Sequence, residues 1–154
     1  YHCCKLAKAN NCRIALSLSD SFCVDRHREE LCDLINKYVD IIFANETEIQ
    51  SMYQSNFQES LKKIREVTET GAITLGSKGS IVFQNQVKNL VPAIIVNDPV
   101  DTTGAGDIFA SGFLFGLINK YSIEDCGKLG SKVASDIIKH IGARPKKSFK
   151  TFLN

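Results

Sequence analysis

Hydrophobic residues in the first two thirds of the chain fall into short alternating or continuous runs, which are typical of β-strands. Residues 13–19 alternate apolar and small polar side chains and predict a strand. The continuous apolar runs 41–44 and 72–75 are typical of strands that are buried on both faces of a sheet. Further short strands are predicted at 81–83, 87–91 and 94–96.

Other segments repeat apolar residues every three or four positions, which predicts amphipathic helices. Asn56 followed by Glu59 indicates a helix start, because an Asn side chain can accept a hydrogen bond from an amide of the first turn. The predicted helices cover residues 25–37, 57–67, about 104–119 and 123–141.

Strand and helix alternate along the first half, which is the pattern of an α/β layered domain with a largely parallel sheet flanked by helices. Ligands of such sheets bind beyond the carboxyl ends of the strands. Polar loops at Asn45, Gly76 and Gly104 each follow a predicted strand. We therefore expect these loops to share one edge of the sheet.

Composition excludes several classes of protein. The chain has 154 residues, 44% hydrophobic and 23% charged, an ordinary balance for one globular domain. The net charge is +2 and the only basic run that stands out is short, at 144–147, so no nucleic-acid partner is expected. The longest apolar stretch, 108–118, is too short to span a bilayer, so no membrane partner is expected either.

The cysteines and histidines do not form a metal-binding pattern. None of the six cysteines belongs to a C-x-x-C pair and the three histidines are scattered, so no zinc site is expected. We expect reduced cysteines and a cytoplasmic protein. The chain begins with Tyr1 rather than a methionine, and we expect it to be part of a longer protein.

Residues 101–107, Asp-Thr-Thr-Gly-Ala-Gly-Asp, carry the strongest chemical signal. Small residues at Gly104, Ala105 and Gly106 let an anion approach the backbone at the start of a predicted helix, where the first amides have no internal partner. Asp107 can then accept a proton from an attacking hydroxyl while the amides hold a phosphate. The alternative is a glycine-rich turn whose aspartate merely suits the helix dipole.

Asn45 and Glu48 form a second polar pair, three residues apart and therefore on one face of a helix. An amide and a carboxylate in this arrangement can hold the water shell of a magnesium ion bound to phosphates. The same spacing is also that of a helix capping box, and the residues alone do not separate the two alternatives.

Together with Ser-Gly-Phe-Leu at 111–114, the segment 101–107 resembles the second signature of the PfkB carbohydrate kinase family, which includes ribokinase and adenosine kinase. Asn45 to Glu48 resembles the N-x-x-E motif of that family. The resemblance implies a ribokinase-like fold, Asp107 as catalytic base, the amides of Gly104 to Gly106 as an anion hole, and magnesium near Asn45 and Glu48.

The segment 74–79 resembles the T-x-G-x-x-G loop of the same family, where small residues let ATP lie against the backbone. Taken alone, this segment is a common tight turn. The residues that the resemblance assigns to ATP are Thr74, Gly76, Ser77 and Gly79.

Asp101 and Thr103 resemble the residues that bind a monovalent cation, often potassium, in many family members. Residues 142–145 resemble the segment that closes this cation site, but Lys146 stands where ribokinase often has a serine. Asp101 suits a turn or an N-cap equally well. The segment 16–20 resembles the adenosine-kinase-like branch.

The resemblance covers residues 13–145 and about half of a typical family member, so 1–154 is expected to be the C-terminal, nucleotide-binding part of a kinase domain. It implies transfer of the γ-phosphate of Mg-ATP to a hydroxymethyl group of a sugar or nucleoside, such as ribose or adenosine. A parallel sheet cut mid-way exposes an apolar edge, so this fragment alone is expected to be poorly soluble or inactive.

Two other functions fit these residues less well. A non-catalytic nucleotide-binding module would have no need of Asp107. A dinucleotide-binding oxidoreductase is disfavoured because no G-x-G-x-x-G opens the first strand–helix unit.

Overall fold

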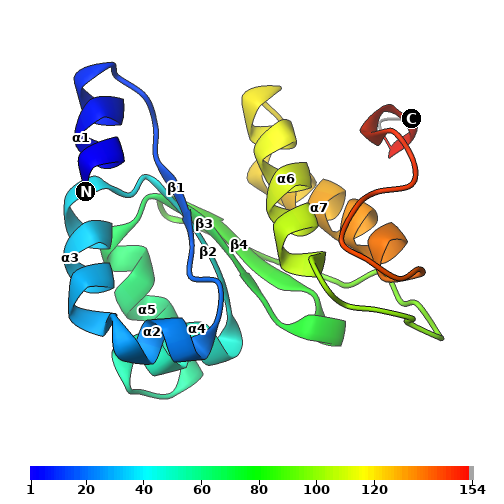
Figure 1. Ribbon diagram of the computed structural model, residues 1–154, viewed down its shortest axis with the longest axis horizontal. Coiled ribbons are helices and arrows are strands. Elements are labelled where there is room, and N and C mark those ends of the chain that lie inside the picture. The colour runs from blue at the N-terminus through cyan, green and yellow to red at the C-terminus, as the bar shows by residue number, and fades with distance from the viewer. Residues whose placement is uncertain (153–154) are drawn as a thin grey trace. The chain divides into compact units, whose positions relative to one another are not determined.

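The computed structural model describes residues 1–152, which form two compact units. The first unit contains residues 1–73 and 83–87, and the second contains residues 74–82 and the chain from residue 88 onward. Figure 1 labels helices α1 to α7 and strands β1 to β4.

Five strands form one sheet in the order β1-β2-β3-β4-β5. β1 pairs with β2 in parallel, with Ala15 opposite Ile41, whereas β4 and β5 are joined by two residues and so form an antiparallel hairpin. The strands are β1 (Ala15–Ser17), β2 (Ile41–Asn45), β3 (Thr70–Thr74), β4 (Ser80–Gln84) and β5 (Val87–Val91). The predicted α/β class, with a mostly parallel sheet flanked by helices, is confirmed.

The strand predicted at 94–96 is wrong, because these residues belong to no strand or helix. Pro92 follows β5 directly and has no amide hydrogen to donate to a ladder. The side chains of Ile94 and Ile95 are 47% and 83% exposed, so they do not add to the core of the sheet. The β-forming tendency of these residues was therefore outweighed by the lack of a strand partner.

The first unit has five helices among its described residues, and α2 to α5 lie beside β1 to β3 in Figure 1. The helix predicted at 25–37 is instead two helices, which meet at His27, where φ is −125°. The helix at the beginning of the chain was not predicted. These helices are α1 (His2–Ala9), α2 (Ser21–Arg26), α3 (Arg28–Tyr38), α4 (Glu46–Tyr53) and α5 (Phe57–Val67).

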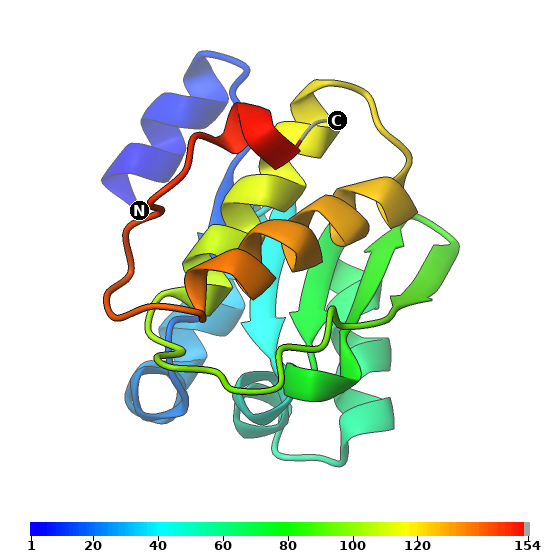
Figure 2. The ribbon, with the colours of Figure 1, turned by 90° about the vertical axis from the view of Figure 1, so that its right-hand side faces the viewer.

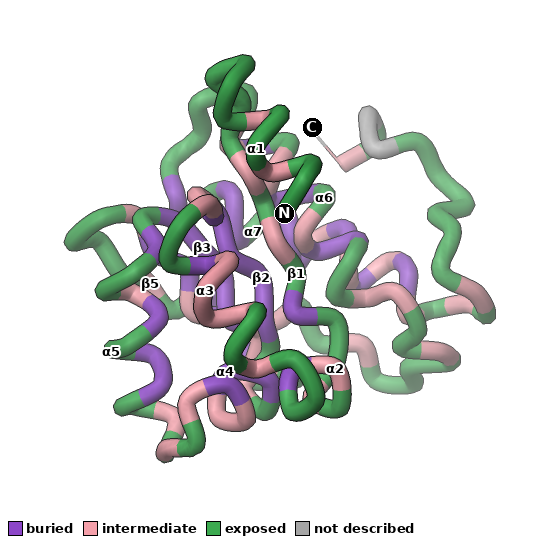
Figure 3. Tube along the Cα trace, turned by 60° about the vertical axis from the view of Figure 1, so that its left-hand side comes forward, coloured by how far each residue is buried: buried purple, intermediate pink, exposed green. Residues whose placement is uncertain are grey.

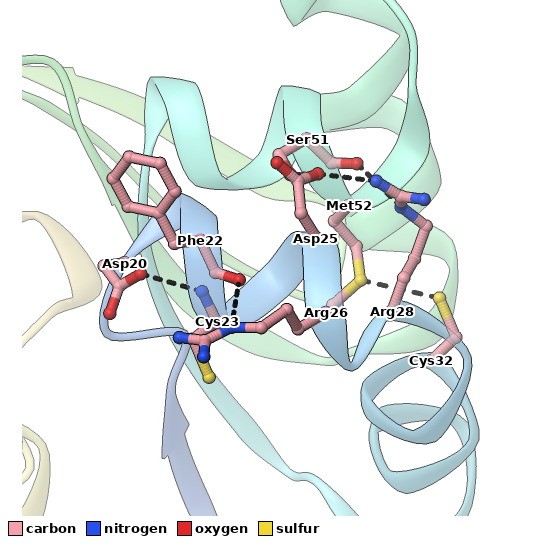
Figure 4. A network of polar contacts seen from close by, with 9 residues as sticks. All are labelled: Asp20, Phe22, Cys23, Asp25, Arg26, Arg28, Cys32, Ser51 and Met52. Atoms are coloured by element: carbon pink, nitrogen blue, oxygen red, sulfur yellow. Dashed lines mark hydrogen bonds and ion pairs between the residues drawn. The ribbon is translucent and has the colours of Figure 1, made fainter.

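A polar network explains the break between α2 and α3 (Figure 4). Arg28, just after the break, donates from Nε to the carbonyl of Ser51 at 3.0 Å and from Nη2 to Asp25 Oδ1 at 2.6 Å. Ser51 Oγ donates to the same Asp25 oxygen at 2.6 Å. The end of α2 and the start of α3 are thus both held to α4, which a single straight helix would not allow.

The core of the first unit surrounds the central strands. Ile42 and Ile73 are fully buried, as are Ile49 and Ile64 on the helices beside them. β2 is buried along most of its length in Figure 3, whereas α1 has no buried residue. The predicted N-cap of α5 is confirmed, since Asn56 accepts a hydrogen bond from the amide of Glu59.

The second unit is built on two long helices, α6 (Ala105–Ile118) and α7 (Ile123–Ile137), which lie side by side (Figure 2). A Cβ atom on Gly112 would lie 2.7 Å from the Val133 side chain and 3.0 Å from the Cα atom of Gly130, so the two backbones approach closely here. α7 ends four residues before its predicted end at Ile141. Two one-turn helices, η1 (Gly76–Lys78) and η2 (Phe149–Phe152), complete this unit.

Ile108 of α6 packs with Leu129, Val133 and Ile137 of α7 in the core of this unit. Within residues 1–152, no helix combines the length and the apolar character that crossing a membrane requires.

A substitution at Gly71 tests the packing of the first unit. A Cβ atom there would lie 2.6 Å from side-chain atoms of both Ile42 and Phe83, so we expect Gly71→Ala to cost about 1–3 kcal/mol of unfolding free energy. Urea unfolding measures this. Glu69→Ala, at an exposed neighbouring position, should change stability by less than about 0.5 kcal/mol. Equal stabilities of the two variants would contradict the packing described here.

Candidate active site

Gly104 sets the start of α6. It is the N-cap residue and has φ of +77°, in the left-handed region that favours glycine. A Cβ atom at this position would lie 2.5 Å from the Cβ atom of Ala143, so no larger residue fits. The first intrahelical bond runs from the amide of Ile108 to the carbonyl of Gly104 at 2.9 Å.

Several amides at this helix start lack a partner. The amides of Gly104, Gly106 and Asp107 make no hydrogen bond to any residue within 1–152. The predicted free amide of Ala105 is instead paired with the carbonyl of Thr102 at 3.1 Å. The open amides and the positive end of the helix dipole form a place that favours a bound anion.

Asp107 lies in the first turn of α6, three residues after the N-cap, and its side chain is exposed. Its own carbonyl accepts a hydrogen bond from Ser111 Oγ at 2.8 Å. No hydrogen bond or ion pair within residues 1–152 engages its carboxylate. The carboxylate is therefore available to accept a proton from a group that approaches the start of the helix.

Asp101 connects the loop before α6 to the segment after α7. Its Oδ1 accepts from the amide of Thr103 and its Oδ2 from the amide of Gly142, both at 2.9 Å. Hydrogen bonding by the Thr103 side chain, then by the amides of Gly142 and Thr103, lowers the pKa of Asp101 to about 2. The structure thus brings the two segments predicted to form a cation site together, with Asp101 acting as a turn residue; cation binding stays a prediction.

A pocket of about 390 Å³ opens within the second unit. Its walls come from the loop after β3, the segment after β5, the start of α6 and one face of α7. The lining residues include Thr74, Gly76, Ser77, Gly79, Ala93, Ile94, Ile95, Val96, Pro99, Thr102, Ala105, Gly106, Phe109, Ser131, Ala134, Ser135 and Ile138. Gly104, Asp101, Thr103 and Asp107 are not among the lining residues.

The loop 74–79 is the tight turn that its sequence indicates. The amide of Leu75 donates to the carbonyl of Gly79 at 2.8 Å, and Gly79 has φ of +101°. A Cβ atom on Gly79 would lie 2.0 Å from the carbonyl oxygen of Val91, so the backbones meet here. The residues predicted to contact ATP in this loop all line the pocket, together with Gly106 of the second motif.

Asn45 and Glu48 lie at the start of α4 in the first unit and form a complete capping box. Asn45 Oδ1 accepts from the amide of Glu48 at 2.8 Å, while Glu48 accepts from the backbone and side-chain nitrogens of Asn45 at 2.8 and 2.6 Å. Glu48 is 5% exposed, and burial raises its pKa despite the Asn45 amide. The capping alternative is confirmed, and the magnesium role stays a prediction.

The carboxylate oxygens of Glu48 are still suited to bind the water shell of a cation. Each carboxylate oxygen of Glu48 uses one lone pair on Asn45 and keeps another, which can accept from a water molecule. Residues 1–152 contain no group of three or more His, Cys, Asp or Glu side chains that could hold a metal ion directly. A magnesium ion would therefore be held through water or through phosphate oxygens.

The C-terminal helices are expected from the family resemblance to hold the nucleotide, but no individual residue of α7 or of the segment 94–96 was predicted for the site. Ser131 and Ser135 are four residues apart, so both lie on one face of the helix. The four-residue spacing of these serines was visible in the sequence. The repeat of apolar residues along α7 predicted a buried helix face more strongly, so the serines were not recognised as pocket residues.

The chain is similar to known proteins in both sequence and structure. The pfkB family carbohydrate kinase model matches residues 2–149. The structure of a probable sugar kinase from Rhizobium etli is 43% identical with a TM-score of 0.93, and the match covers 97% of this chain and 46% of that one. Adenosine kinase from Sinorhizobium meliloti has the same TM-score and coverage at 39% identity.

Among curated proteins, adenosine kinase from Dictyostelium discoideum is 32% identical over 92% of this chain and 46% of its own length. The chain spans about half the length of the curated relatives it matches.

The hydrogen bonds of Asp101 predict a pH-dependent stability. A lowered carboxyl pKa stabilises the folded state above the ordinary value of 3.8, and this contribution is lost as the pH falls toward about 2. We expect Asp101→Asn to lower the melting temperature by a few degrees at pH 7. The difference from the wild type should shrink below about pH 4. A difference that stays constant from neutral to acidic pH would disprove this account.

Two glycine substitutions form a matched pair at the start of α6. Gly104→Ala places a Cβ atom against Ala143 at positive φ, so we expect a loss of about 1–3 kcal/mol of unfolding free energy. At Gly106 an added Cβ atom has no other atom within 4 Å, and φ is not in the left-handed region. Gly106→Ala should therefore leave the unfolding free energy unchanged or raise it by up to about 1 kcal/mol. Urea denaturation compares them, and the opposite order would refute the described helix start.

Proposed function

Because the chain belongs to the pfkB family of carbohydrate kinases, we propose that it supplies the nucleotide-binding part of an ATP-dependent kinase. The acceptor is a hydroxymethyl group of a sugar or nucleoside. The observation that carries the proposal is the start of α6, where open amides, an exposed aspartate and the edge of a pocket occur within four residues.

The amides of Gly104, Gly106 and Asp107 hold the phosphate end of the donor. They point from a helix start whose backbone is fixed by Gly104, so they need no rearrangement when negative charge develops on the transferring group. The close approach of an anion to this backbone is possible because Gly106 has no side chain. These amides stabilise charge on the phosphates in the transition state.

Asp107 accepts the proton of the attacking hydroxyl. The hydroxyl oxygen forms a bond to the γ-phosphorus, the bond between that phosphorus and the β,γ-bridging oxygen breaks, and ADP departs with the electron pair. The exposed carboxylate of Asp107 takes up the proton that the alcohol loses. Carboxylates are weak bases, which suits a loose transition state in which the proton leaves late.

The pocket of the second unit accommodates the nucleotide. Its volume of about 390 Å³ lies in the range of small-ligand sites, and its walls combine apolar side chains with a few hydroxyl groups. Gly76 and Gly79 line one wall of the pocket and have no side chains. A planar or anionic ligand can therefore approach their backbone closely. When bound, ATP supplies the phosphoryl group that is transferred.

Two cations complete the proposal. Asn45 and Glu48 would orient the water shell of a magnesium ion, which neutralises phosphate charge when bound. Asp101 and Thr103 would hold a monovalent cation such as potassium, because the hydrogen bonds that lower the pKa of Asp101 favour its negatively charged form. The substrate proposed is a nucleoside or sugar such as adenosine or ribose, in keeping with relatives described as adenosine kinase and probable sugar kinase.

Replacing Asp107 tests the proposed reaction. In the complete product of the gene, Asp107→Asn should slow ADP formation by at least ~100-fold, the scale of losing a general base. The dissociation constant for ATP should change little, because the open amides remain. A coupled assay measures the rate of ADP formation with adenosine, other nucleosides, ribose and fructose, with and without potassium. Calorimetry measures the dissociation constant for ATP.

Asp125 provides a matched control, since it is the aspartate three residues after the N-cap of α7, as Asp107 is in α6. Asp125→Asn removes the same charge from a helix start outside the pocket and should leave turnover near the wild-type value. Near-normal turnover of Asp107→Asn would reject the assigned base. ATP binding by the wild type without any phosphoryl transfer would point instead to a binding module.

A further inference from the structure

Arg28, the first residue of α3, holds the end of another helix, α4. Its Nε donates to the carbonyl of Ser51 in the last turn of α4 at 3.0 Å. Its Nη2 donates to Asp25 Oδ1 at 2.6 Å, and the Ser51 hydroxyl donates to that same oxygen (Figure 4). With the oxygen of its amide turned toward Arg28, the C-cap residue Gln54 accepts from Nη1 and Nη2 at 3.3 and 3.2 Å. One guanidinium therefore joins α2, α3 and the end of α4.

α4 has no basic residue of its own at this end. Its first turn carries Glu46 and Glu48, which suit the positive end of the helix dipole, but its last turn carries no Lys or Arg. The last carbonyls of a helix lack partners within it, so a cation placed there forms hydrogen bonds and favours the dipole. Arg28 supplies that cation from α3, and its side chain is only 29% exposed. Its hydrogen bonds are therefore less weakened by water than those of a fully exposed ion pair.

The same helix carries the proposed magnesium pair at its start. Asn45 is the N-cap residue, and Glu48 lies three residues before Ser51, about 4.5 Å along the axis. Ile49 and Met52 pack one side of α4 into the core, but apolar packing is not directional. The hydrogen bonds of Arg28 are directional, so they resist rotation of α4 about its axis and sliding along it. The direction in which the Glu48 carboxylate points therefore depends on the contact one turn away.

We propose that Arg28 is a positioning residue for the magnesium site, because its hold on α4 keeps Asn45 and Glu48 oriented toward the water shell of the ion. The inference rests on the proposed function and adds a residue to it. Groups that orient metal ligands without binding the ion change metal affinity by about 10- to 100-fold when they are replaced. Glu48 would bind magnesium through water, so we expect an effect at the lower end of this range.

Calorimetric titration of the complete gene product with ATP, once in EDTA and once in excess magnesium, tests this role. The dissociation constant in EDTA divided by that in magnesium measures how strongly the ion assists ATP binding. We expect Arg28→Met to lower this ratio by about 10-fold and to leave ATP binding in EDTA unchanged. The variant should also need more magnesium for half-maximal ADP formation. Its rate at saturating magnesium should stay near that of the wild type, because Asp107 is unaltered.

Arg26→Met is the matched control. Arg26 lies two residues before Arg28 and has the same charge, but its Nε donates to the carbonyl of Phe22 in its own helix at 3.3 Å. This variant should keep the wild-type ratio. Arg28→Lys retains the positive charge but not the planar fork that reaches Ser51 and Asp25 together, so it should lose part of the ratio. Melting curves show whether each variant folds, and Arg28→Lys provides the test if Arg28→Met does not.

The possible outcomes separate this role from the proposed function. A wild-type ratio in both Arg28 variants would overturn the role of Arg28 and leave the nucleotide site intact. Equal weakening of ATP binding in EDTA and in magnesium would also overturn it, because Arg28 would then support the fold and not the metal pair. If magnesium does not assist ATP binding by the wild type, the magnesium site and the role of Arg28 are both rejected. Failure of the wild type to bind ATP at all would reject the proposed function.

Discussion

The left-handed conformation of Gly104 is the constraint on which the candidate site depends. It turns the chain into α6 at one defined residue, and the absence of a Cβ atom lets the turn lie against Ala143. Because the helix starts there, the amides of Gly106 and Asp107 fall outside the intrahelical ladder and the carboxylate of Asp107 falls in the first turn. If α6 began one residue later, the Asp107 carboxylate would be displaced by about 100° around the helix axis relative to the first turn.

In the second unit the same helix pair forms the core and part of the pocket wall. Glycines on α6 and α7 let the helices touch through their backbones, and the pocket lies against the same helix pair. Asp101 then closes a connection between the loop before α6 and the segment after α7 through two amides. The ribokinase-like fold implied by the sequence is confirmed by solved structures that share 39% and 43% of its residues.

Much of this arrangement could be predicted from the sequence because its signals are local. The glycine motif at 101–107, the turn at 74–79 and the buried strand at 41–44 each follow from conformational limits of a few adjacent residues. The errors arise where distant contacts decide. The break at His27 depends on Arg28 reaching Ser51, and the irregular path of 94–96 depends on Pro92 and on the lack of a strand partner. Which face of α7 lines a pocket depends on how α7 packs against α6.

The backbone contact between α6 and α7 has a consequence for the thermodynamics of ligand capture. Where α6 and α7 meet, Gly112 and Gly130 have no side chains of their own whose rotamers could freeze when a ligand arrives. The segment 93–99 on another wall has no regular hydrogen bonding. Any ordering of backbone by a ligand in the pocket would therefore fall on that segment, and stiffening it is a route to tighter binding.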